Sequence, residues 1–200
     1  MLRGFTIIEL LVVVALVAIL MGIIFPVMAY AKRQAMVTVD VSNLKSIGVA
    51  IALYQEDWND RAPTVAKLVH AGYITEGVAV SPLDKTPQGQ ANEFELIAGK
   101  QPDPARLSYL SLADSTETEI DRVLASRGGG SVVSLAEARY LIPSEGVGGY
   151  FTGDYLRLCM DGSVQKRKII WDGPSHDNLR SNHLWLFTDE KELFPVSAYP

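Results

Sequence analysis

The side chains that most often catalyse reactions or bind metals are few in this chain, and their spacing matches no catalytic or metal-binding motif. The three histidines lack the i,i+4 spacing of a His-Glu-x-x-His zinc site, so we expect surface or packing residues: His70, His176 and His183. Cys159 is the single cysteine and alternates with apolar residues, which favours burial and excludes an intramolecular disulfide. No Gly-x-Ser-x-Gly or P-loop segment occurs. We therefore expect no enzymatic activity, no bound nucleotide and no cofactor.

Charge narrows the choice of partner. The 200 residues carry 18 Lys and Arg against 23 Asp and Glu, a formal net charge of −5. Phosphate contacts need a basic surface, so we expect no nucleic-acid partner. The late aspartates have the oxygen chemistry that calcium prefers but lack EF-hand spacing, and we assign no metal ligand among Asp154, Asp161, Asp172, Asp177 and Asp189.

One carboxylate, Glu9, stands at the start of the most apolar part of the chain. The 22 residues from Leu10 to Ala31 carry no charge and would span about 33 Å as a helix, enough to cross a bilayer. This run is too long for the apolar region of a secretory signal peptide. A charge inside such a span costs about 2.5–3.5 kcal/mol or more, so it normally has a partner. The simplest alternative places Glu9 at the lipid headgroups, where the helix dipole favours an anion.

The segment around Glu9 resembles the amino terminus of type IV pilins and type II secretion pseudopilins. Arg3 and Gly4 match a short basic leader that ends in glycine. Phe5 and Glu9 match the phenylalanine after the cleavage site and the glutamate four residues beyond it. The resemblance covers about the first 31 residues, and Pro26 falls where many members carry a helix-kinking proline.

The resemblance implies that a membrane-embedded prepilin peptidase cuts between Gly4 and Phe5 and that Phe5 is then N-methylated. It implies a single-pass inner-membrane protein, held in lipid before assembly, with its carboxy-terminal domain outside the cytoplasm. An inner-membrane assembly platform would transfer it into a helical filament of itself and other pilins or pseudopilins, in the periplasm or at the cell surface. Basic residues flank the span on both sides and do not by themselves favour this orientation. In a filament, Glu9 can neutralise the Phe5 ammonium of a neighbouring copy, because a pair costs less than either charge alone.

The helical pattern continues beyond the apolar run. Apolar residues recur at spacings of four and three, which predicts a helix from about Phe5 to Asp57, loosened near Pro26 where a backbone hydrogen bond is lost. The apolar stripe consists of Val37, Val41, Leu44, Ile47, Ile51, Tyr54 and Trp58. The opposite positions hold Lys32, Gln34, Asp40, Lys45 and Gln55. We expect this half of the helix to be the spine on which a sheet packs.

After residue 60 the composition becomes that of a small mixed domain. An Asp161-Gly162 dipeptide between two alternating runs is the strongest short-range signal for a β-hairpin. Glycine-rich loops are expected at 128–130 and 146–153. The other predicted elements are a short helix over Val65–Ile74 closed by Gly72, a strand over Leu107–Leu112, a helix over Thr116–Arg127, the hairpin over Tyr155–Trp171 and a strand over Leu184–Phe187.

These elements predict an α+β, pilin-like fold. Its long N-terminal helix spans the membrane in its first half and carries a small antiparallel sheet of three or four strands on its second half. The expected organisation is a leader over residues 1–4, a membrane and assembly segment over 5–31, the soluble half of the helix over 32–60 and a globular domain with a carboxy-terminal hairpin over 61–200.

The favoured interpretation is a structural subunit, a pseudopilin or pilin-like protein of a type II secretion or type IV pilus-like filament. The alternative is a membrane-tethered periplasmic or surface binding module that does not polymerise. Its motivation is the long loops around Pro82–Pro104 and Gly146–Gly153.

Overall fold

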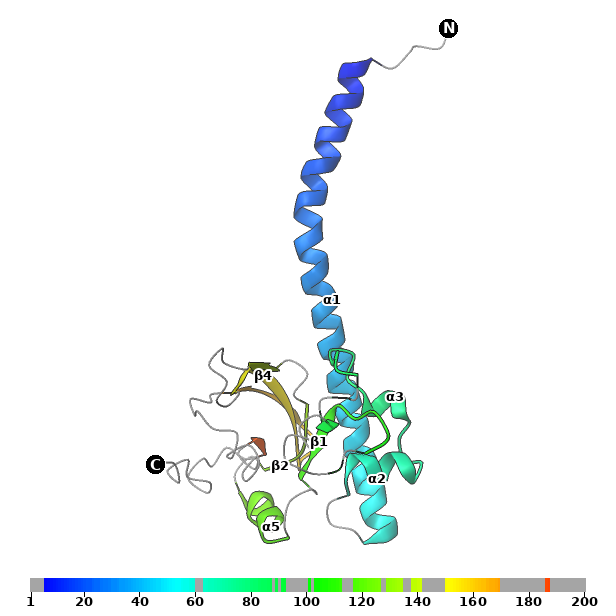
Figure 1. The fold of residues 1–200 in the computed structure, drawn as a ribbon, viewed down its shortest axis with the longest axis vertical. Helices are drawn as coiled ribbons and strands as arrows, with labels where there is room; N and C mark the ends of the chain where they lie inside the picture. The colour runs from blue at the N-terminus through cyan, green and yellow to red at the C-terminus, as the bar shows by residue number, and fades with distance from the viewer. Residues whose placement is uncertain are drawn as a thin grey trace, which may run out of the picture. The chain divides into compact units, whose positions relative to one another are not determined.

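The computed structural model describes residues 6–59, 63–87, 89, 91–92, 101, 103–112, 117–126, 129–134, 138–141, 150–169 and 186–187. The chain divides into two compact units, Met1–Thr38 and Val39–Pro200. The described part of the first unit holds the first half of helix α1 (Ile7–Trp58). The described part of the second holds the rest of α1, three shorter helices and a five-stranded sheet (Figure 1).

Helix α1 is 52 residues long and confirms the predicted long helix, apart from Phe5, which lies outside the described residues. Pro26 lies inside the helix. The helix ends at Trp58. Asn59 follows with a φ of 53°, and its N–H donates to the carbonyl of Gln55 at 3.0 Å. Asparagine adopts this left-handed conformation more readily than most residues, so it suits the end of a helix.

Within the second unit, α1 buries the central part of the predicted apolar stripe. Leu44 and Ile47 are fully buried and Ile51 nearly so, whereas Trp58 is 66% exposed. The prediction for Asp40 is wrong. The sequence placed it on the polar side of the helix, opposite the apolar stripe, whereas the structure buries it fully. Residue 40 lies one helical turn before Leu44, and residues four apart share a face of a helix.

The buried carboxylate of Asp40 joins α1 to two strands of the sheet. The hydroxyl of Tyr109 donates to its Oδ1 at 2.5 Å, and the hydroxyl of Ser134 donates to its Oδ2 at 2.7 Å. The amide of Asn43 donates to the Tyr109 oxygen at 3.2 Å and to the carbonyl of Val80 at 3.3 Å. Burial and the charge of Asp40 raise the pKa of Tyr109 far above its usual 10.0, so the phenol keeps its proton. A satisfied buried network of this kind fixes one register of the helix on the sheet.

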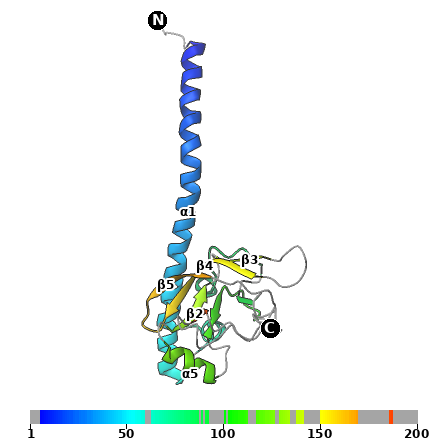
Figure 2. The same ribbon diagram turned by 90° about the vertical axis from the view of Figure 1, so that its left-hand side faces the viewer.

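The sheet is antiparallel and centres on one long strand (Figure 2). The strands are β1 (Tyr109–Ser111), β2 (Gly130–Ser134), β3 (Ala138–Leu141), β4 (Tyr150–Cys159) and β5 (Val164–Ile169). Strand β5 pairs with residues 153–158 along one edge of β4. The opposite edge of β4 is shared, since β3 pairs along 150–153 and β2 along 156–159, and β1 then pairs with β2.

The predicted hairpin is confirmed in β4 and β5. The N–H of Gly162 donates to the carbonyl of Cys159 at 3.0 Å, and the N–H of Cys159 donates to the carbonyl of Ser163 at 2.8 Å. Gly162 has a φ of 78°, as the left-handed position of a three-residue hairpin loop requires. The carboxylate of Asp161 accepts from the N–H of Ser163 at 2.9 Å and rigidifies the turn.

Among the described residues the sheet contains five strands, where three or four were predicted. Strands β2 and β3 were missed because runs of four or five residues carry little periodicity. Strand β4 starts at Tyr150, inside the predicted glycine-rich loop, whose residues 146–149 lie outside the described residues. The predicted strand at 184–187 is wrong for its described part. Leu186 and Phe187 form a buried turn, and the carbonyl of Phe187 accepts a hydrogen bond from the N–H of Gly130 at 2.7 Å.

The core of the second unit lies between α1 and one face of the sheet. Leu158 of β4 sits against Gly48 of α1, where an added Cβ would lie 3.2 Å from its Cδ2. Leu156 and Val132 are buried with it, while Ser134 reaches Asp40 as described above. Because alternate residues of a strand share a face, this face of β4 carries Leu156 and Leu158.

Three shorter helices lie in the described part of the second unit. Helix α2 (Val65–His70) is followed by Gly72 at a φ of 80°, and the N–H of Tyr73 donates back to the carbonyl of Leu68 at 2.9 Å. This is the glycine-terminated end that the sequence predicts. Helix α3 spans Glu76–Ala79. Helix α5 (Glu117–Ala125) confirms the helix predicted over Thr116–Arg127.

Candidate assembly site on the amino-terminal helix

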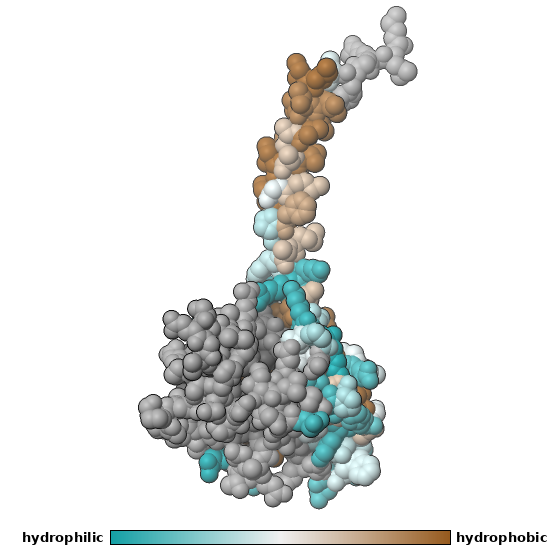
Figure 3. All heavy atoms as spheres, viewed as in Figure 1, coloured by the Kyte–Doolittle hydropathy of each residue, from teal (hydrophilic) through white to brown (hydrophobic). Residues whose placement is uncertain are grey.

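The first half of α1 presents a continuous apolar surface. From Ile7 to Val27 the exposed fractions of the large apolar side chains run from 47% at Val17 to 78% at Ile7. Figure 3 shows this stretch as a largely hydrophobic surface. Among the described residues, α1 is the one helix long and apolar enough to cross a membrane. Exposed apolar surface on this scale marks a contact with lipid or with another protein.

Two polar residues cap the beginning of this surface. The hydroxyl of Thr6 accepts a hydrogen bond from the N–H of Glu9 at 3.3 Å, which makes Thr6 the N-cap of α1. In return, Oε2 of Glu9 accepts from the N–H and from the hydroxyl of Thr6, both at 2.8 Å. This reciprocal arrangement is a capping box. It holds the carboxylate in the first helical turn, where the helix dipole favours an anion.

The capping box leaves one oxygen of Glu9 for a further partner. Both bonds from Thr6 go to Oε2, and no described residue donates to Oε1. Glu9 is exposed on a helix whose other surface here is apolar. A carboxylate oxygen in such surroundings can accept a strong, charge-assisted hydrogen bond from a cation brought by another molecule.

Of the residues that the sequence predicts to act in processing and assembly, the structure describes some and not others. Gly4 and Phe5, the predicted cleavage and methylation positions, lie outside the described residues. Glu9 and Pro26 both lie in α1. Thr6 was missed as a functional residue. Its signal was readable, because a threonine three residues before a glutamate at the start of an apolar run is the sequence signature of a capping box.

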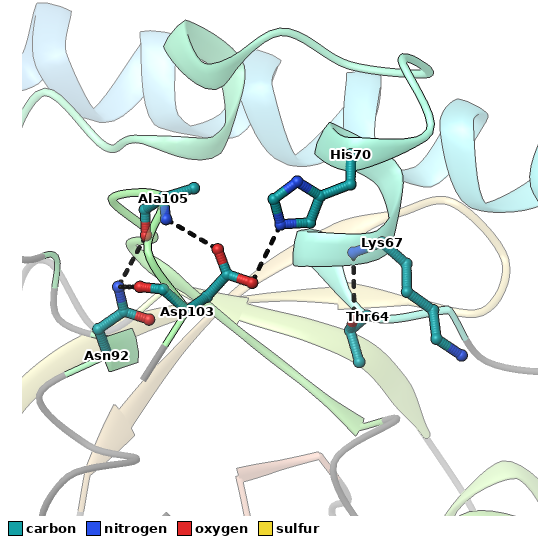
Figure 4. Close-up of polar contacts among 6 residues, drawn as sticks. All are labelled: Thr64, Lys67, His70, Asn92, Asp103 and Ala105. Carbon is teal, nitrogen blue, oxygen red and sulfur yellow. Dashed lines mark hydrogen bonds and ion pairs between the residues drawn. The ribbon is translucent and has the colours of Figure 1, made fainter. Parts of the chain in front are cut away.

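In the second unit, the polar residues around His70 serve to hold the fold together. His70 Nε2 and Asp103 Oδ2 lie 3.2 Å apart, and Asp103 Oδ1 accepts from the N–H of Ala105 at 2.8 Å. The amide of Asn92 donates to the carbonyls of Asp103 and Ala105 at 3.0 and 2.8 Å (Figure 4). These contacts tie the 103–105 segment to the end of α2. The 57% exposure of the His70 side chain confirms the prediction of a surface residue.

A cavity of about 300 Å³ lies beside this cluster, with Thr64, Asp103 and Tyr109 among its lining residues. Thr64 uses its hydroxyl to cap α2, accepting from the N–H of Lys67 at 3.0 Å (Figure 4). Asp103 and Tyr109 make the hydrogen bonds described above. These three polar groups therefore serve the fold.

The metal-binding and redox candidates of the sequence form no site within the described part of the chain. The described residues contain no group of three or more His, Cys, Asp or Glu side chains that could hold a metal ion. Cys159 is buried, as predicted. His176 and His183 lie outside the described residues, as do Asp172, Asp177 and Asp189.

Comparison with known proteins identifies the first part of the chain. Residues 3–25 match the family model of the prokaryotic N-terminal methylation motif. Over 97 residues, the chain is 33% identical to the type IV wide pilus major component PilA4 of Thermus thermophilus, a match that covers 48% of this chain and 72% of that protein. The chain belongs to the type IV pilin family. No solved structure matches it.

Membership in the type IV pilin family confirms the resemblance drawn from Gly4, Phe5 and Glu9. The predicted α+β architecture, with a long first helix and a small antiparallel sheet, is confirmed as well. The family implies assembly into filaments with other pilins, and α1 supplies the apolar segment suited to membrane anchoring.

Proposed function

We propose that this type IV pilin is a structural subunit of a pilus-type filament. Its leader, residues 1–4, is removed by a prepilin peptidase that cuts between Gly4 and Phe5, and Phe5 is then N-methylated. Segment 5–31 first holds the protein in the inner membrane as a single span, with residues 61–200 outside the cytoplasm. An assembly platform then moves it into the filament. The support is the methylation-motif match over residues 3–25 and the identity to a pilus component rather than a secretion component.

The carboxylate of Glu9 carries the assembly step in this proposal. After cleavage, the amino terminus of Phe5 is a cation at the edge of an apolar helix. The oxygen of Glu9 that Thr6 leaves open accepts the ammonium of a neighbouring subunit. Because unpaired charges are costly in a low dielectric, subunits that stack out of register lose this pair and are rejected.

The exposed surface of α1 supplies the attraction between subunits. In lipid the helix already contacts hydrocarbon, so transfer into a filament depends on close contact between helices rather than on burial from water. Small residues permit such contact: Ala15, Ala18 and Gly22 lie along α1, and a Cβ at Gly22 would meet no atom within 4 Å. Pro26 removes one backbone hydrogen bond and is the proposed point at which the helix bends during transfer.

Mass spectrometry of sheared filaments tests the processing step. The expected subunit begins at N-methyl-Phe5. A native filament subunit that begins at Met1 would overturn the proposal, and a membrane protein that never enters filaments would favour the tethered binding module instead.

Substitutions at Glu9 test the assembly step. Glu9→Gln keeps the shape of the side chain and removes its charge, so we expect membrane insertion at the wild-type level and loss of filaments. Glu9→Asp keeps the charge and should retain part of the assembly. Wild-type assembly of both Glu9→Gln and Glu9→Ala would remove the charge-pairing argument.

A further inference from the structure

Three aromatic side chains and the carboxylate of Asp57 gather at the carboxy-terminal end of α1. The rings of Tyr54 and Trp58 stack with centroids 6.1 Å apart, and Tyr73 meets Tyr54 edge-on at 5.2 Å. The indole N–H of Trp58 donates to the Tyr73 oxygen at 3.2 Å, and the Tyr73 hydroxyl donates to Asp57 at 2.5 Å. We call Tyr54, Asp57, Trp58 and Tyr73 the acidic-aromatic patch.

The side chains of the patch are held by hydrogen bonds to one another, and the patch is exposed to solvent. The polar atoms of Trp58 and Tyr73 already have partners inside the patch, so covering the rings would break no hydrogen bond. Trp58 is nevertheless 66% exposed. Tryptophan is strongly enriched at the energetic centres of protein interfaces, and its ring face attracts cations, as does the neighbouring carboxylate of Asp57.

The complementary charge lies on β5 of the same chain. Lys166, Arg167 and Lys168 follow one another on this edge strand, which we call the basic strand. Lys166 and Lys168 are exposed. Lys166 lies 3.1 Å from Asp154, but both side chains are more than two-fifths exposed, and exposed pairs of this kind are weak. Lysines on an edge strand also discourage uncontrolled strand pairing, which is the simpler interpretation of this sequence.

The two surfaces lie at different levels of the second unit. Lys166 pairs with Leu156, which pairs with Ser134, and Ser134 bonds Asp40. The basic strand is therefore level with residue 40 of α1. Trp58 is 18 residues further along α1, which is about 27 Å of helix. Figure 1 shows the end of α1 near α2.

We propose that the acidic-aromatic patch of one subunit docks on the basic strand of a second copy of this chain. Two different, complementary surfaces about one domain length apart make a heterologous contact, which propagates into an open filament instead of closing a dimer. Lys168 and Lys166 would lie against the face of Trp58 and the carboxylate of Asp57. This inference rests on the proposed function, because it names a contact between subunits of that filament.

Cross-linking of mixed filaments tests the contact directly. Filaments grown from unlabelled and ¹⁵N-labelled subunits are sheared and treated with a carbodiimide, which joins a carboxylate to an amine only where they touch. We expect peptides in which Asp57 of one isotope is joined to Lys166 or Lys168 of the other. Filaments that yield cross-links between copies but none between these two surfaces would overturn the inference and leave the proposed function standing.

A charge exchange separates specific pairing from simple damage to the fold. Asp57→Lys alone and Lys168→Glu alone should each lower the yield of filaments about fivefold or more, the effect of roughly 1 kcal/mol per contact. The combined Asp57→Lys/Lys168→Glu variant should recover most of the yield. Glu76→Lys and Lys85→Glu, which change exposed charges outside both surfaces, are the matched controls and should assemble as the wild type does.

Three results would overturn the contact. They are wild-type yields from both single variants, no recovery in the combined variant, or equal losses in the matched controls. Trp58→Ala gives a separate measurement and should lower the yield, with Trp58→Phe in between. If the wild-type protein forms no filaments at all, the proposed function fails and this interface fails with it.

Discussion

Thr6 and Glu9 bond each other reciprocally at the start of α1: the hydroxyl of Thr6 accepts from the N–H of Glu9, and the carboxylate of Glu9 accepts twice from Thr6. The capping box thus fixes the geometry of the proposed assembly carboxylate before any neighbour arrives. It also satisfies backbone groups that a helix start would otherwise leave unpaired.

Replacement of Thr6 by alanine should loosen this start. Thr6→Ala removes the acceptor of the Glu9 N–H and one donor to Oε2, which costs about 1 kcal/mol at an N-cap. We expect faster amide hydrogen exchange at Glu9 in the full chain in detergent micelles. Thr6→Ser keeps the hydroxyl and should exchange at nearly the wild-type rate. Equal rates in wild-type and Thr6→Ala protein would contradict the capping role.

Removal of the Asp40 carboxylate should destabilise the second unit strongly. Asp40→Ala leaves the hydroxyls of Tyr109 and Ser134 buried without this acceptor, and each lost partner costs about 1–3 kcal/mol. We expect a lower midpoint of urea unfolding, followed by tryptophan fluorescence. Asp40→Asn retains an acceptor oxygen and should lose less. Glu76→Ala, at an exposed site, should match the wild type.

The raised pKa of Tyr109 predicts a loss of stability at alkaline pH. Above the ordinary tyrosine pKa of about 10, the unfolded chain releases this proton while the folded chain keeps it. The unfolded state then binds fewer protons, so the free energy of unfolding falls by about 1.4 kcal/mol per pH unit from this group. Below pH 10 both states are protonated, and the group gives no pH dependence.

Tyr109→Phe checks that assignment. The variant should be less stable than the wild type at neutral pH, because the hydrogen bond to Asp40 is lost. Between pH 10 and 11, by the same titration argument, its free energy of unfolding should fall less steeply than that of the wild type. Parallel pH profiles for the two proteins would show that another group controls the alkaline transition.

The hairpin turn should tolerate side chains according to their backbone preferences. Gly162 has a φ of 78°, and a Cβ there would meet no atom within 4 Å, so the obstacle is conformation and not space. Gly162→Val should cost about 1–2 kcal/mol, whereas Gly162→Asn should cost less, because asparagine enters the left-handed region more readily. Thermal unfolding midpoints measure the difference, and equal midpoints for the two variants would refute this explanation.

The local pattern of residues along the sequence determined the long helix, the hairpin and the family of this protein. The charge-free run after Glu9 and the spacing of the apolar stripe predict α1, and the Asp161-Gly162 dipeptide between alternating runs predicts the β4–β5 hairpin. Such signals need only neighbours in the sequence, since helices and tight turns close over a few positions. The leader around Gly4, Phe5 and Glu9 likewise identified the family.

Tertiary structure decided what depends on distant segments meeting. Asp40 reads as a polar helix residue until Tyr109 and Ser134, far along the chain, supply its hydrogen bonds. Strands β2 and β3 exist because one long strand offers both of them the same edge. The acidic-aromatic patch forms because Tyr73 folds back onto the end of α1. A short strand or a buried charge is stable only with its partners in place, and the local sequence does not contain those partners.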